Sequence, residues 1–218
     1  LGRGFASEVW RDPATGIDWV YSRKEGGEAE DPIVRFQLGD PKVSEPVWDR
    51  TKNGKSDVPW FQLSADGKQF ADAFPWYRCG VGNLEQNDWK MLANGCWPGI
   101  APDNSYRSFV FAGNHRQLDM FDAGETTPRV VMLTGGAIAP RHRCYHPRWS
   151  NHPRYLTMTS PQSKECELYL SRFNEDWTAV EERFRVTNND KANLYGDAWI
   201  QSATTATPTP AAVAGKLS

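Results

Sequence analysis

The chain has 218 residues, which suits one all-β domain, and its 25 Lys and Arg against 27 Asp and Glu leave a formal charge of −2. This balance predicts no attraction to nucleic acid or to an acidic membrane surface. No apolar run approaches the roughly 18 residues of a membrane span, so we expect no membrane insertion. The first residue is Leu rather than Met, which suggests a segment of a larger protein with further domains as partners.

Short strands separated by turns are expected along the chain, because aromatic and β-branched runs alternate with Gly, Pro, Asn and Asp clusters. They group into repeats at about 6–50, 58–92, 97–133 and 146–186. One more strand is expected at 197–201. Residues 202–218, rich in Thr, Pro and Ala, have too little hydrophobic bulk to order and are predicted to be a linker or a disordered tail.

An apolar residue precedes a polar turn in each repeat, and these positions recur 37 to 53 residues apart: Trp10, Leu63, Ile100, Trp149 and Trp199. Such a period, with several short strands per unit, is typical of β-propeller blades. The turns LSADGK (63–68) and WSNHPR (149–154) resemble the W-S-P-D-G repeat of TolB-like, or WD40-like, propellers. The segments GCWPGIAPDNSYR and HPRWSNHPRYLTMT are similar to propeller regions of large secreted proteins of planctomycete-type bacteria.

This resemblance implies an all-β propeller of four-stranded antiparallel blades in a secreted, periplasmic or cell-surface protein. It covers about residues 6–201 and speaks to the fold more than to the function, since one fold hosts many functions. Four repeats are visible. The ring either closes within this chain, with residues 197–201 used in closure, or forms part of a ring with more blades.

Four cysteines occur without a CxxC spacing, which argues against a zinc ribbon or a thioredoxin-like redox pair. In the expected arrangement of blades, Cys79 lies near Cys96, and Cys144 lies near Cys166. We therefore expect two disulfides, although four cysteines allow three connectivities. The alternative is four unpaired cysteines that pack as small hydrophobic residues.

Strand direction alternates within a blade, so loops that precede first strands and loops that follow second strands emerge on one face, here called the loop face. All four cysteines are expected there. The candidate binding residues on this face are Trp97, His115, Arg116, Arg141, His142, Arg143, Tyr145 and His146. Guanidinium groups bind carboxylates and sulfates of acidic polysaccharides, and aromatic rings stack on sugars.

We expect a non-catalytic binding or scaffolding module, without a cofactor, that recognises a protein or an extracellular glycan through the loop face. The alternative is a metal-dependent polysaccharide lyase or hydrolase resembling oligogalacturonate lyase. In that case His115, His142 and His146 are the candidate ligands of a divalent metal, because imidazole suits Zn, Mn and Fe. The chain departs from that family: it is too short for its ring, and the family's His and Gln ligands have no counterpart position by position.

Overall fold

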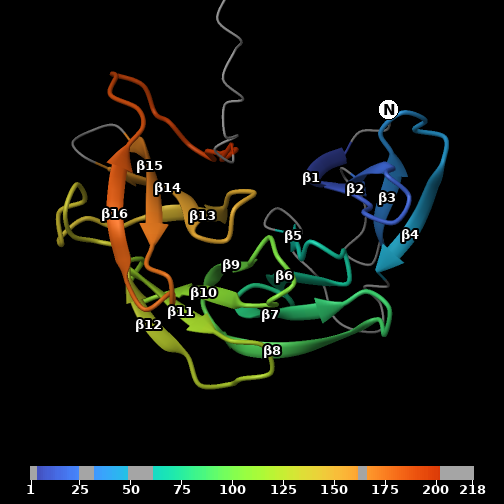
Figure 1. The fold of residues 1–218 in the computed structure, drawn as a ribbon, viewed down its shortest axis with the longest axis horizontal. Helices are drawn as coiled ribbons and strands as arrows, with labels where there is room; N and C mark the ends of the chain where they lie inside the picture. The colour runs from blue at the N-terminus through green and yellow to red at the C-terminus, as the bar shows by residue number, and fades with distance from the viewer. Residues whose placement is uncertain (1–3, 25–31, 49–60, 162–165, 202–218) are drawn as a thin grey trace, which may run out of the picture.

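The computed structural model describes residues 4–24, 32–48, 61–161 and 166–201. These residues form four four-stranded antiparallel sheets and contain no helix, so none of them could span a membrane as a helix. Each sheet uses four strands that are consecutive in sequence. Figure 1 shows the sheets as blades set in an arc around a common centre. The predicted all-β propeller fold is confirmed.

The four blades are numbered I to IV in chain order. Blade I consists of β1 (Gly4–Arg11), β2 (Asp18–Lys24), β3 (Ile33–Gln37) and β4 (Ser44–Trp48). Blade II consists of β5 (Gln62–Leu63), β6 (Gln69–Ala73), β7 (Arg78–Asn83) and β8 (Asp88–Asn94). Blade III consists of β9 (Cys96–Ile100), β10 (Ser108–Ala112), β11 (Gln117–Phe121) and β12 (Arg129–Met132). Blade IV consists of β13 (Tyr145–Trp149), β14 (Tyr155–Pro161), β15 (Cys166–Phe173) and β16 (Val180–Arg185).

Each sheet contains strands that the sequence analysis placed in one repeat. The expected boundary between the first two repeats, at 50 to 58, lies outside the described residues, as does the expected tail at 202–218. The strand expected at 197–201 is not formed. Residues 194–201, here called the C-terminal segment, form no backbone ladder and contact the turn after β13 through a side chain. The Asn151 amide accepts a hydrogen bond from Ile200 N at 2.6 Å and donates one to Ile200 O at 3.1 Å.

Aromatic side chains fill the space between neighbouring blades. One apolar cluster joins blades I and II, where Tyr21 stacks on Phe61 with ring centroids 5.4 Å apart. A second cluster joins blades III and IV, where Phe109 lies 4.9 Å from Trp149. A smaller cluster around Cys79, Val110 and Phe121 lies between blades II and III. The hydrophobic core is therefore divided into two main parts, each shared by two blades.

The two expected disulfides are not present, because Cys79, Cys96, Cys144 and Cys166 are all free thiols. Cys79 and Cys144 are buried. Burial raises the pKa of each thiol to about 12; for Cys79 the nearby Cys96 and Asp72 act in the same direction. These cysteines remain protonated near neutral pH and pack as small hydrophobic residues, as in the alternative interpretation.

Candidate functional site

The first strand of each blade ends in a turn that is fixed by its own side chains. In blade II the Ser64 hydroxyl donates to Asp66 Oδ1 at 2.7 Å and accepts from Gln69 N at 3.1 Å. In blade IV the Ser150 hydroxyl bonds both the carbonyl and the amide of His152 at 3.0 Å. Short polar side chains satisfy the backbone groups of a turn in this way. The Ser of the repeated turn motif therefore fixes the end of the first strand in blades II and IV.

The turn after β5 is also bonded to the blades on either side of it. The Trp10 indole N–H of blade I donates to Ala65 O of blade II at 2.8 Å. Blade II continues the series, since Asp66 N donates to Asn104 Oδ1 of blade III at 2.9 Å. These bonds hold the ends of the first strands together on one side of the propeller. This side lies opposite the loop face, and we call it the turn face.

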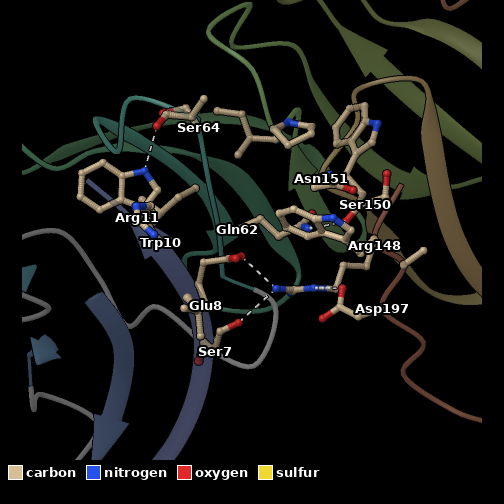
Figure 2. Close-up of a pocket in the computed structure, with 18 residues that line it drawn as sticks. Ser7, Glu8, Trp10, Arg11, Gln62, Ser64, Arg148, Ser150, Asn151 and Asp197 are labelled. Carbon is tan, nitrogen blue, oxygen red and sulfur yellow. Dashed lines mark hydrogen bonds and ion pairs between the residues drawn. The ribbon is translucent and has the colours of Figure 1, made fainter. Parts of the chain in front are cut away.

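A pocket of about 580 Å³ opens among these strand ends. All four blades and the C-terminal segment contribute to its wall, and Figure 2 shows their side chains directed into one space. We call it the axial pocket. Its lining is Ser7–Arg11, Gln62–Ala65, Ile100, Pro102, Arg148–Asn151 and Asp197–Trp199. A concave, largely apolar wall with a few convergent polar groups is the usual form of a ligand site.

Arg148 organises the charged part of the axial pocket. Its Nη2 donates to Glu8 Oε2 at 2.8 Å and to Ser7 O at 3.2 Å, and its Nε donates to Asp197 Oδ1 at 3.1 Å. Figure 2 shows the guanidinium between the two carboxylates. One side chain of β13 thereby connects β1 with the C-terminal segment.

The two carboxylates that bind Arg148 differ in their exposure to solvent. Burial raises the pKa of Glu8 to about 7; the attraction of Arg148 opposes this rise, and the negative charge of Asp197 adds to it. The Asp197 side chain is 73% exposed. Near neutral pH the pocket therefore contains one carboxyl group that can accept or donate a hydrogen bond and one that faces solvent.

Trp199 stands at the mouth of the axial pocket and is 82% exposed. Asn151 fixes the chain beside it through the two bonds to Ile200, and Tyr195 packs on His146 with ring centroids 4.1 Å apart. An indole that is held by its backbone and open to solvent is available as a stacking platform.

Four of the predicted loop-face residues do come together. The Trp97 ring lies 5.2 Å from His115, 6.1 Å from Tyr145 and 4.9 Å from His146, and His115 lies 5.2 Å from Tyr145. All four are half-buried, and we call them the aromatic cluster. Trp97, His115 and His146 adopt the left-handed backbone region, with φ of 39°, 64° and 51°. Non-glycine residues are uncommon there and tend to occur at functional sites.

The remaining predicted residues surround the aromatic cluster without joining it. Arg141 and Arg143 are exposed, and Arg116 donates to Arg141 O at 3.2 Å. Among the described residues no ring contact links His142 to the cluster, and the buried Nδ1 atoms of His142 and His115 have no hydrogen-bond partner.

A shared metal site at His115, His142 and His146 is not supported. Within residues 4–24, 32–48, 61–161 and 166–201, no group of three His, Cys, Asp or Glu side chains is arranged to hold a metal ion. The cluster rings also pack on one another at 4.9 to 6.1 Å. Burial lowers the pKa of His115 and of His146, with Arg143 adding to the effect on His115 and His115 to that on His146.

Sequence reasoning missed the axial pocket. Its charged residues come from three distant parts of the chain, since Glu8 and Arg148 are 140 positions apart and Arg148 and Asp197 are 49 apart. A weak signal was present: Arg148 and Asp197 stand one and two residues before the aligned Trp149 and Trp199. Side chains just before the turn position were therefore candidates for the centre of the ring.

Comparisons with known proteins support the fold. No protein-family model and no curated protein matches the sequence. Among solved structures, a candidate TolB from Agrobacterium tumefaciens matches at 14% identity over 88% of this chain and 65% of its own, with a TM-score of 0.60. An auxiliary nutrient binding protein from Bacteroides thetaiotaomicron matches at 10% identity over 91% of this chain and 44% of its own, with a TM-score of 0.56.

An oligogalacturonate lyase in complex with manganese also matches, at 14% identity over 86% of this chain and 54% of its own, with a TM-score of 0.53. The chain thus spans 44% to 65% of the length of these three structures. At such identities the likeness shows a shared TolB-like propeller architecture and not a shared activity.

Proposed function

We propose that this protein is a non-catalytic binding module whose ligand, a glycan or a protein segment, occupies the axial pocket. The observation that carries the proposal is the wall of the pocket: all four blades and the C-terminal segment contribute, and Trp199 at its mouth is 82% exposed. Ligand sites tend to form where loops from several elements of a rigid scaffold meet. A secreted, periplasmic or cell-surface location belongs to the same proposal.

Two features favour binding over catalysis. The metal-dependent lyase alternative requires a group of metal ligands, and the described residues offer no group of three His, Cys, Asp or Glu side chains for it. The charged side chains of the pocket also satisfy one another, since Arg148 bonds both Glu8 and Asp197. The aromatic cluster and the arginines of the loop face then serve scaffolding, as a second surface for protein contacts.

The test is an array of immobilised oligosaccharides and peptides, probed with the intact chain and two variants. Ala198→Trp places a large side chain in the wall of the axial pocket. The double variant Arg141→Ser and Arg143→Ser changes exposed groups of the loop face alone. We expect the first variant to lose the array signal and the second to keep it. Absence of any signal with the intact chain, or the reverse pattern, would reject the axial pocket as the site.

A further inference from the structure

Each arginine of the axial pocket has a carboxylate partner other than Glu8. Arg148 pairs with Asp197 at 3.1 Å, and Arg11 lies 3.8 Å from Asp18, with its own side chain 72% exposed. Glu8, whose pKa is about 7, adds a further negative charge when it is ionised. An anionic ligand near Arg148 would meet the Asp197 carboxylate and would have to displace it. The pocket therefore has no surplus positive charge for phosphate or uronate groups.

The part of the pocket that is formed by uncharged side chains exposes aromatic and apolar surface. Trp199 and Val9 are 82% and 58% exposed, and both line the pocket. The Asp197 carboxylate, 73% exposed, lies two residues from Trp199. A pyranose ring has apolar C–H faces and a rim of hydroxyl groups. An open indole beside a carboxylate and a guanidinium matches both features.

The pocket is poorly suited to an extended peptide. Such ligands usually add a strand to a free sheet edge and pair with its backbone. Here the first strand of blade II is only two residues long, Gln62–Leu63. Ser7 O accepts from Arg148, and Trp149 O accepts from the Gln62 amide at 3.4 Å. The side chains of the pocket occupy backbone groups that a peptide would need.

We infer that the axial pocket binds a neutral oligosaccharide, with Trp199 as the stacking platform and Asp197, Arg11 and Arg148 as hydrogen-bonding partners of the sugar hydroxyls. This inference rests on the proposed function, because it names the ligand class of the same pocket. It differs from the acidic polysaccharide that the loop-face arginines suggest from sequence, since the charge balance of the pocket favours an uncharged ligand.

The test is isothermal titration calorimetry of the intact chain with tetrasaccharides and a peptide at constant ionic strength. The neutral probes are cellotetraose, xylotetraose, maltotetraose and chitotetraose; the acidic probe is tetragalacturonate, and the peptide is an uncharged Ser/Thr/Val hexamer. We expect saturable binding of at least one neutral probe, with tetragalacturonate at least ten-fold weaker. Trp199→Ala should weaken binding at least ten-fold. Trp76→Ala, which removes a 60% exposed indole outside the pocket, should leave it unchanged.

The outcomes separate the inference from the proposed function. Tighter binding of tetragalacturonate than of any neutral probe, or neutral binding that survives Trp199→Ala, overturns the inference. Binding of the hexapeptide alone, lost in Ala198→Trp, overturns the inference and leaves the proposed function standing. Failure of every probe, together with an empty array, rejects both. Because Trp199 is 82% exposed, its replacement should not affect folding, and circular dichroism checks this.

Discussion

Gly67 is the residue at which the turn motif of the sequence meets tertiary packing. Its φ is +71°, and a Cβ built there would lie 2.5 Å from Cζ2 of Trp10. The indole cannot easily move away, because its N–H bonds Ala65 O in the same turn. Glycine is thus required both by the backbone conformation and by the close approach of blade I.

Replacing Gly67 with Ala should lower the free energy of unfolding by about 3 kcal/mol, because left-handed strain and an overlap with Trp10 act together. Gly124→Ala is the matched control: φ is +81°, but no atom lies within 4 Å of the added Cβ, so we expect only about 1 kcal/mol. Urea denaturation measures both values. Equal losses for the two variants would show that the contact with Trp10 is not limiting.

At the residue scale, strand alternation predicted that His115, Tyr145 and His146 share one face, but it predicted neither their packing around Trp97 nor the axial pocket. In the structure the rings of these three residues meet at Trp97. The Glu8 and Arg148 pair could not be found in this way. It depends on how far blades I and IV stand apart across the centre, and this distance follows from the curvature of the arc rather than from any local pattern.

Among the elements, β1, β13 and the C-terminal segment are held together by one charged group. Arg148 of β13 bonds Glu8 and Ser7 O of β1 and Asp197 of the segment. The sequence predicted the strands well because turn chemistry marks their ends. The strand predicted at 197–201 was wrong. Strand propensity does not reveal whether a neighbouring strand has free backbone groups to form a hydrogen-bond ladder. In the structure the Asn151 side chain bonds this segment instead.

The connection through Glu8 should depend on pH. The pKa of Glu8 rises from 4.5 to about 7 on folding, so between these values the unfolded chain releases a proton that the folded chain keeps. The contribution of Glu8 to the free energy of unfolding is therefore fully present below about pH 4.5. It is lost as the pH rises toward 7, by roughly 3 kcal/mol at most. Glu8→Gln cannot ionise, so it should gain stability relative to the parent chain between pH 5 and pH 8.

Urea denaturation of both chains at several pH values measures this difference. Asp197→Asn is a useful companion variant, because it removes the nearby negative charge that helps to raise the pKa of Glu8. The pH range over which stability falls should then move downward. A difference between the parent chain and Glu8→Gln that stays constant from pH 5 to pH 8 would contradict the raised pKa.

On the scale of the whole molecule, the buried apolar core is divided by pairs of blades, although strands of blades II and III also lie close together. One core cluster belongs to blades I and II and another to blades III and IV, while the cluster between blades II and III has only three fully buried members. Figure 1 shows blades I and IV at the two ends of the arc. The axial pocket draws its wall from both pairs. The geometry of the pocket therefore depends on how rigidly the two pairs are joined.

Proteins open in cooperative units that follow their packing, so the two pairs of blades should exchange amide hydrogens as separate units. Phe61→Ala removes a fully buried ring from the first pair, and Met158→Ala removes a fully buried side chain from the second. Each change should cost about 3 kcal/mol within its own unit. Native-state exchange read by mass spectrometry should show faster exchange in 4–24, 32–48 and 61–94 for Phe61→Ala, and in 96–161 and 166–185 for Met158→Ala. Uniform acceleration across all four blades would show instead that the contacts between blades II and III make the propeller one cooperative unit, and that the axial pocket has a rigid wall.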